Sequence, residues 1–134
     1  MDNISLANEA IKARERAYSP YSNFCVGAAL LAKSGRLYHG CNIENAAYSP
    51  TNCAERTAFF KAVSEGERDF SAIAIAGWPK YGKSGFAYPC GVCRQVMMEF
   101  CDPKTFRIIV ASEEETTSHL LEELLPNGFG PANL

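Results

Sequence analysis

The apolar residues of this chain change their spacing several times, and this alternation limits the folds that the chain can adopt. Steps of three and four residues, typical of one face of a helix, occur over residues 3–17 and again over residues 53–64. Residues 72–76, which read AIAIA, form a short apolar run of buried-strand length. Helical and strand-like segments that alternate in this way predict a mixed sheet covered by helices on both faces.

The other segments extend this predicted order. Residues 25–33 and 36–42 are two strand-like runs, and the Ser34-Gly35 pair between them has the turn chemistry that joins strands as a hairpin. Residues 90–100 repeat at helical steps, and residues 106–111 form another apolar strand. The expected fold class is therefore α/β, a three-layer α/β/α sandwich around a mixed sheet of about five strands.

The end of the chain is the least defined part of this prediction. A last helix is expected to begin at Thr116 or Thr117, either of which can cap it, and to run through Leu125 before Pro126-Asn127-Gly128. Residues 112–118 are short and acidic where a last edge strand would lie, so the sequence leaves a fifth strand open. The turn-rich stretch 77–88 receives no assignment.

Length and charge exclude several classes of protein. The 134 residues suit one domain over residues 1–134, and 47% hydrophobic residues with 21% charged residues are typical of a folded chain. Thirteen basic against fifteen acidic residues give a net charge of −2 without a basic cluster, which argues against a nucleic-acid partner. No apolar run approaches the ~20 residues of a membrane span, and the first residues lack a signal-peptide profile. We therefore expect a cytoplasmic protein without a membrane partner.

Three of the six cysteines are predicted to meet at one place. Cys53 opens one predicted helix, while Cys90 and Cys93 lie on the first turn of another, and both helices follow a strand. Their N-termini should therefore lie at the same end of the sheet, where ligand sites of α/β proteins form. Three thiolates suit a tetrahedral zinc ion and leave one position open, which is typical of catalytic rather than structural zinc.

Two charged residues that follow Cys53 fit a catalytic zinc site. Glu55 is placed to move protons close to the metal, and Arg56 can donate hydrogen bonds to the cysteine sulfurs. Cys25, Cys41 and Cys101 are expected to be small buried apolar residues, because free cysteine is among the most buried residue types. His39 and His119 are expected to have surface or structural roles.

The motifs Cys53-Ala54-Glu55 and Pro89-Cys90-Gly91-Val92-Cys93 match the cysteine variant of the zinc deaminase signature. Three further blocks, SPYSNFCVGAAL (19–30), GCNIENAAYSP (40–50) and LLPNGFGP (124–131), lie in the same order as in one family. From Tyr18 nearly to the C-terminus, the chain resembles the small, homotetrameric, three-cysteine cytidine deaminases. The resemblance implies hydrolysis of cytidine and deoxycytidine to uridine and deoxyuridine with release of ammonia, a reaction of pyrimidine salvage.

This resemblance also implies the metal and catalytic roles. Cys53, Cys90 and Cys93 would bind one Zn²⁺ per subunit, with Arg56 holding the sulfurs and Glu55 shuttling protons.

The resemblance implies a substrate pocket built from several segments. Phe24 would pack on the pyrimidine, Asn42 and Glu44 would bind the ribose hydroxyls, and backbone at Ala54 and Cys90 would read the edge of the base. Three residues would be contributed across a subunit interface, namely Ala46, Tyr48 and Phe129. The partners implied are a free pyrimidine nucleoside and further copies of the chain, with a tetramer expected.

Three alternatives remain open at this point. A relative that deaminates a nucleoside antibiotic such as blasticidin S shares the CAE and PCxxCRQ blocks, although Asn42-Ile43-Glu44 and Phe129-Gly130-Pro131 favour cytidine. A thioredoxin-like redox role for Cys90 and Cys93 leaves Cys53 and Glu55 unexplained. A structural zinc module without turnover is the third alternative.

Overall fold

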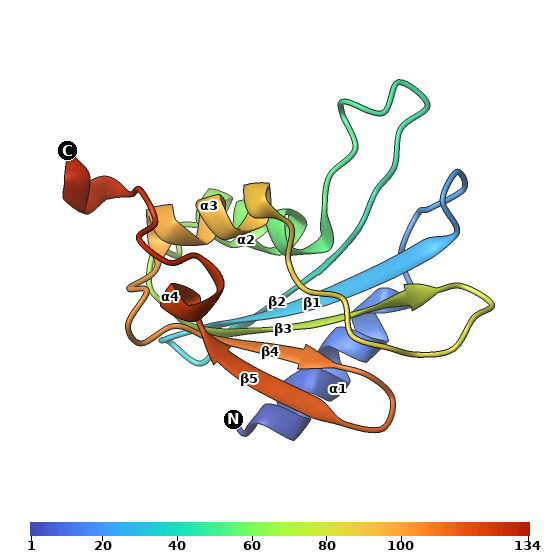
Figure 1. Cartoon of the computed structure of the whole chain (residues 1–134), viewed down its shortest axis with the longest axis horizontal. Coiled ribbons are helices and arrows are strands. Elements are labelled where there is room, and N and C mark those ends of the chain that lie inside the picture. Colours follow the sequence, from blue (N-terminus) through green and yellow to red (C-terminus); the bar gives the residue numbers. More distant parts are fainter.

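The computed structural model describes all 134 residues and contains one mixed sheet of five strands (Figure 1). The strands are β1 (Phe24–Ala32), β2 (Leu37–Cys41), β3 (Phe70–Pro79), β4 (Arg107–Ala111) and β5 (Thr116–Leu120). Their order across the sheet is β2-β1-β3-β4-β5. The β3–β4 pair is parallel and the other pairs are antiparallel, which confirms the mixed sheet expected from the sequence.

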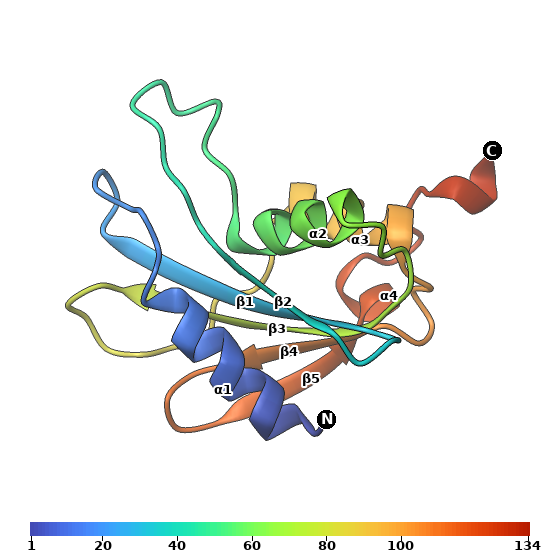
Figure 2. The same cartoon turned by 180° about the vertical axis from the view of Figure 1, so that it is seen from behind.

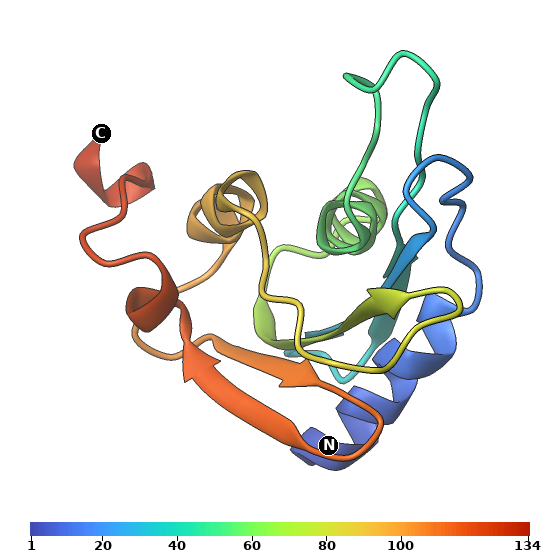
Figure 3. The same ribbon diagram turned by 45° about the vertical axis from the view of Figure 1, so that its right-hand side comes forward.

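The helices cover both faces of this sheet, as Figures 2 and 3 show. They are α1 (Asn3–Arg14), α2 (Ala54–Ser64), α3 (Gly91–Phe100), the short α4 (Leu121–Leu124) and the 3₁₀ helix η1 (Pro131–Asn133). Helix α1 packs on one face, while α2 and α3 lie side by side over the other. This confirms the three-layer α/β/α sandwich. None of the helices combines the length and the apolar character needed to cross a lipid bilayer.

Strict alternation along the central strands produces two apolar cores, one on each face. In β3, Ala72, Ala74 and Ala76 face the α1 side. The residues between them, Ile73 and Ile75, face α2 and α3. Side chains of a strand point to opposite faces with a period of two, so a strand that is buried on both faces reads as a continuous apolar run. The AIAIA pattern is therefore explained by burial under helices on both sides.

The expected last helix is wrong in its first half. Residues 116–120 form β5 and pair antiparallel with β4, with Thr116 opposite Ala111 and Leu120 opposite Arg107. The helix α4 occupies only Leu121–Leu124. Without β5, strand β4 would be an edge strand with unpaired backbone N–H and C=O groups. Residues 116–120 pair with these groups and so form the last strand of the sheet. The fifth strand that the sequence left open is therefore present.

Two other expected boundaries differ by a few residues. Helix α1 ends at Arg14 rather than at residue 17, and β3 continues to Pro79, beyond the expected end of the strand at residue 76. The extension of β3 places Trp78 in the apolar core, where the Arg14 guanidinium lies 4.1 Å from the centre of its ring. Residues 77–79, part of the unassigned stretch, thus belong to the sheet.

The topology gathers several segments at one end of the sheet. Strand β1 begins where β3 ends, because Phe24 pairs with Pro79. Strand β2 ends at this same end, and residues 42–53 then form a long loop that rises beyond α2 (Figure 1). The N-termini of α2 and α3 both follow connections that leave this end. A site built here draws on residues far apart in sequence.

Candidate active site

Three cysteines lie together at the N-termini of α2 and α3. The sulfur atoms of Cys53, Cys90 and Cys93 all lie within 4.8 Å of one another. The Sγ atoms of Cys53 and Cys90 are 3.8 Å apart, and those of Cys90 and Cys93 are 3.5 Å apart. Cys53 and Cys90 are the N-caps of their helices, both with extended backbone. The partial positive charge of a helix N-terminus favours the thiolate form of a cysteine placed there.

The spacing of the sulfurs fits a zinc ion. Zinc–sulfur distances of about 2.3 Å put the sulfurs of a tetrahedral site about 3.8 Å apart. The observed separations are close to this value, and all six cysteines of the chain are free thiols. Hydrogen bonds from Cys93 and then Arg56 lower the pKa of Cys53 to about 5, so one thiol of the cluster is already ionised at neutral pH. The cluster has the chemistry and the geometry of a three-thiolate metal site.

Glu55 lies on the first turn of α2, directly beside this cluster. Its side chain is buried, with 5% of its surface exposed. Burial raises the pKa of Glu55 to about 7, and the charge on Cys53 acts in the same direction. A carboxyl group that gains and loses a proton near neutral pH is suited to general acid and base work.

Arg56 faces the cysteine sulfurs from the same helix turn. Its Nη2 donates to Cys53 Sγ at 3.2 Å, and this hydrogen bond raises the pKa of Arg56. The Nε atom of Arg56 is buried and has no hydrogen-bond partner in the chain. A guanidinium in this place offsets the negative charge of a three-thiolate cluster. The role of Arg56 in holding the metal-binding sulfurs stays a prediction.

Asn42 and Glu44 follow the end of β2, at the same end of the sheet as the cluster, and both side chains form hydrogen bonds within the protein. The amide of Asn42 accepts from Val26 N at 2.9 Å and donates to Phe24 O at 2.8 Å. Glu44 accepts from Ser22 Oγ at 2.5 Å and from Tyr21 N at 3.0 Å. Each side chain still has at least one free hydrogen-bonding position, since an amide and a carboxylate have more donors and acceptors than their internal contacts use. The two residues therefore also order the start of β1.

Four aromatic or small side chains of the expected pocket are exposed. Phe24 is 38% exposed at the start of β1, and Phe129 is 57% exposed near the C-terminus. Ala46 is exposed on the β2–α2 loop, where Tyr48 is 73% exposed with a φ of 62°. Non-glycine residues rarely adopt a positive φ, so the loop holds Tyr48 in a strained conformation. Exposed apolar residues of this kind are available for contact with a ligand or a partner.

The residues to which the sequence gives no catalytic role lie elsewhere. His39 pairs with Glu9 at 2.9 Å on the surface, and His119 on β5 contacts Tyr88 and Thr117. Among the remaining cysteines, Cys25 is buried as expected. Cys41 and Cys101 are only partly buried, so the expectation of full burial is wrong for both of them.

Two residues that follow the CxxC motif connect the site to the C-terminal segment. Arg94 donates through Nε to Pro89 O at 2.7 Å and through Nη1 to Leu124 O. Gln95 donates through Nε2 to Phe129 O at 2.8 Å. Both residues directly follow Cys93, and this position in the sequence was the signal that could have pointed to them.

Comparison with known proteins agrees with this geometry. Residues 2–109 match the family described as the cytidine and deoxycytidylate deaminase zinc-binding region. The chain is 53% identical to the cytidine deaminase of Sporosarcina psychrophila, with 100% of this chain and 96% of that protein covered. It is 51% identical to the cytidine deaminase of Halalkalibacterium halodurans, with 96% and 95% covered.

Solved structures give the same result. The crystal structure of cytidine deaminase from Burkholderia pseudomallei superposes with a TM-score of 0.87 at 45% identity, covering 96% of this chain and 100% of that one. The crystal structure of cytidine deaminase from Mycobacterium tuberculosis has a TM-score of 0.81 at 36% identity, with 97% and 98% covered. The chain belongs to the zinc-dependent cytidine and deoxycytidylate deaminase family. The family resemblance seen in the sequence is confirmed.

Proposed function

We propose that this protein hydrolyses cytidine and deoxycytidine to uridine and deoxyuridine and releases ammonia. The observation that carries the proposal is the buried Glu55, with a pKa of about 7, next to three convergent thiols. A structural zinc site has no need for a buried carboxyl group beside its ligands, whereas hydrolysis of an amine requires a group that moves protons. The full-length similarity to proteins named cytidine deaminase supports this substrate class.

The proposed metal ligands are Cys53, Cys90 and Cys93, with one zinc ion per subunit. Zinc held by these residues supplies a Lewis acid that makes a water molecule acidic near neutral pH. Arg56 stabilises the thiolates, because its guanidinium donates to Cys53 Sγ at 3.2 Å.

Glu55 is the proposed proton shuttle. Its carboxylate takes a proton from the attacking water and passes it to ring nitrogen N3. It then takes the second proton from the same oxygen, now bonded to C4, and gives it to the amino group, which leaves C4 as ammonia. A pKa of about 7 suits both directions of transfer, since the group changes its protonation state with little free-energy cost at neutral pH. Water supplies the oxygen that remains on C4, so cytidine and water give uridine and ammonia.

The proposed nucleoside pocket surrounds this centre. Phe24 packs against the pyrimidine, and Asn42 and Glu44 bind the ribose hydroxyls through the positions that their internal hydrogen bonds leave free. The backbone at Ala54 and Cys90 reads the polar edge of the base. These contacts require no phosphate, in keeping with a free nucleoside rather than a nucleotide or a nucleic acid.

We further propose a homo-oligomer, with a tetramer expected, in which subunits share their active sites. Ala46, Tyr48 and Phe129 are exposed in the single chain, although each belongs to a sequence block of the expected pocket. A neighbouring subunit that covers these residues would bury their apolar surface and close the pocket. The cytoplasmic location and the single-domain organisation stay predictions from the sequence.

The decisive experiment measures ammonia release by the zinc-loaded protein from cytidine, deoxycytidine, cytidine monophosphate and blasticidin S. We expect turnover of the two nucleosides only. Glu55→Gln keeps the shape of the side chain and should lower kcat by about 10²- to 10⁴-fold, the usual contribution of a proton-transfer group. Zinc content of the variant should equal that of the wild type. Turnover of blasticidin S alone would support the antibiotic deaminase, and no turnover of any substrate would support a structural zinc module.

A further inference from the structure

The segment after α4 lies against α3 and is fastened to it around Phe129. Gln95 Nε2 donates to the backbone oxygen of Phe129 at 2.8 Å. The glycines on either side pack against Met98, because an added Cβ would lie 3.2 Å from Met98 Sδ at Gly128 and 3.1 Å from Met98 Cε at Gly130. The backbone of Phe129 is thus held by a hydrogen bond and by close packing on both sides.

The Phe129 side chain has the opposite character. It is 57% exposed, while the neighbouring Gly130 is buried. Figure 3 shows this segment running past α3 on the side away from α2. An anchored backbone with an exposed aromatic ring is a costly arrangement for an isolated chain, since the ring buries little apolar area. Such a ring is available to another copy of the chain.

Helix α3 also holds the metal side of the site. Cys90 is the N-cap of this helix, and Cys93 lies on its first turn. Arg94 donates a hydrogen bond through Nε to the backbone oxygen of Pro89 at 2.7 Å. The same guanidinium donates to Leu124 O, at the start of the segment that leads to Phe129. Helix α3 therefore positions both the thiol cluster of its own subunit and the segment that carries the exposed Phe129 ring.

We propose that Gln95 is a positioning residue, which orients Phe129 for the base pocket of a second copy of this chain. The proposal rests on the shared pocket proposed above. Gln95 is exposed and its hydrogen bond goes to a backbone oxygen, so its effect on catalysis must act through the place where Phe129 is held. Loss of the Gln95 donor lets the segment move without removing the ring.

Gln95→Met tests this role, because methionine has a similar length but no donor. We expect KM for cytidine to rise about two- to tenfold, the range set by one uncharged hydrogen bond, with kcat, zinc content and oligomeric state unchanged. Gln95→Lys restores a donor and should bring KM back toward the wild-type value. Glu99→Met, an exposed substitution one turn further along α3, is the control and should leave KM unchanged.

Combining Gln95→Met with Phe129→Ala tests whether Gln95 acts through the Phe129 ring or through the general stability of the fold. If Gln95 acts through Phe129, Gln95→Met should raise KM in the wild-type background and have no further effect when the ring is absent. An equal rise in both backgrounds, or a fall in kcat with unchanged KM, would overturn the proposal.

Mixed oligomers test whether Gln95 acts between subunits. Oligomers are isolated through two affinity tags from subunits that carry Glu55→Gln and subunits that carry Phe129→Ala. In such an oligomer, the subunits with an intact Glu55 lack the Phe129 ring, and their Glu55→Gln neighbours supply it. A population of sites with wild-type KM should therefore appear. This population should be lost when the Glu55→Gln subunit also carries Gln95→Met.

The outcomes of this experiment are distinct. Recovery of wild-type KM only with an intact Gln95 supports the proposal. Equal recovery with Gln95→Met overturns it and leaves the shared pocket standing. No recovery in either mixture overturns the shared pocket, and with it the role of Gln95 between subunits.

Discussion

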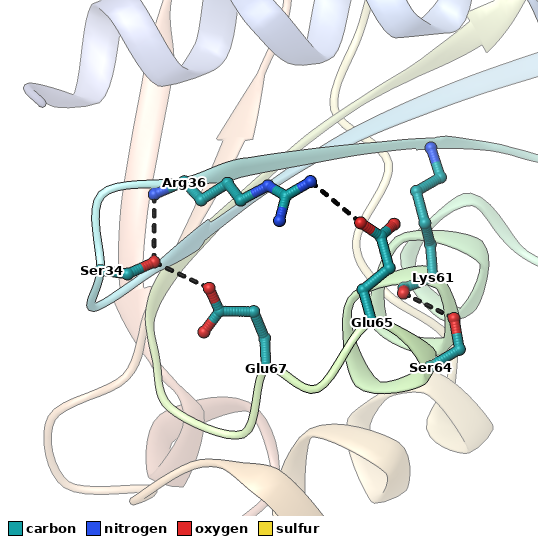
Figure 4. Close-up of polar contacts among 6 residues, drawn as sticks. All are labelled: Ser34, Arg36, Lys61, Ser64, Glu65 and Glu67. Carbon is teal, nitrogen blue, oxygen red and sulfur yellow. Dashed lines mark hydrogen bonds and ion pairs between the residues drawn. The ribbon is translucent and has the colours of Figure 1, made fainter.

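The two ends of the sheet use similar residue types in different ways. At one end, Glu55 and three thiols converge at two helix N-termini, where Glu55 and Cys93 are buried, Cys53 is partly buried and Cys90 is exposed. At the other end, the β1–β2 turn faces the C-terminus of α2, and polar side chains pair in solvent (Figure 4). Arg36 there contacts Glu65 at 3.0 Å, and Ser34 donates to Glu67 at 2.8 Å.

The difference shows how burial turns an ordinary carboxyl group into a reactive one. Burial raises the pKa of Glu55 to about 7. The side chains of Arg36 and Glu65 are 62% and 41% exposed, so water screens their charges and their pairing contributes little to stability. The reactive carboxyl group therefore lies at the end of the sheet where its side chain is buried away from water.

The strongest test of the comparison removes one thiol from the cysteine cluster. Cys90→Ala should abolish stable zinc binding and with it all measurable turnover, because two thiolates leave the ion without a complete set of ligands. Metal content by elemental analysis and ammonia release from cytidine would measure both effects. Cys101→Ala, at the other end of α3, is the control and should keep zinc and activity. Full zinc content in Cys90→Ala would contradict the proposed ligand set.

The next test uses glycines at the two ends. A Cβ at Gly40 would lie 2.3 Å from Ala54 O and 2.6 Å from Ala58 N, so Gly40→Ala forces α2 away from β2. We expect it to lower the free energy of unfolding by about 2 kcal/mol or more, and to lower zinc affinity because Cys53 caps α2.

Gly35 in the β1–β2 turn is the matched position. It has open space around it but a φ of +94°, so Gly35→Ala costs only backbone strain of about 1–2 kcal/mol and should leave zinc affinity unchanged. Urea unfolding with zinc titration would measure both variants. Equal effects on zinc affinity would show that the two ends are not independent.

The pH dependence of stability tests the hydrogen bonds beside the site. Hydrogen bonds, that from Ser22 above all, lower the pKa of Glu44 from its usual 4.5. A carboxyl with a lowered pKa in the folded state adds stability above pH 4.5 and loses that contribution as the pH falls through the folded value. Glu44→Gln should therefore flatten the acid side of the curve of stability against pH. Glu99→Gln is the control, and the same flattening there would contradict the assignment to Glu44.

The smallest effect is expected at the exposed end. Arg36→Ala removes the contact with Glu65 and should lower the free energy of unfolding by less than about 1 kcal/mol, as is usual for a solvated ion pair. Its kcat and KM for cytidine should equal those of the wild type. A clear loss of activity in Arg36→Ala would mean that the far end of the sheet contributes to the site.

Local patterns predicted much of the fold. Spacing alone placed α1, α2 and α3, the β1–β2 hairpin, and the buried strands β3 and β4, because an amphipathic helix and a strand buried on both faces have different apolar periods. The same reasoning failed at β5, where residues 116–120 carry polar side chains without a strand period. Their structure is decided by the free edge of β4, which lies outside the segment itself.

The sequence by itself determined the chemistry that is available at the site: three cysteines at two helix starts, a glutamate two residues after the first of them, and an arginine beside it. Only the tertiary structure decided how these groups behave. Burial that raises the pKa of Glu55, and sulfur atoms 3.5 and 3.8 Å apart, arise from packing between α2, α3 and the sheet. Likewise, the hydrogen bond from Gln95 to Phe129 joins residues 34 positions apart in the chain. Spacing along one segment cannot show such a contact, because it depends on how separate elements come together.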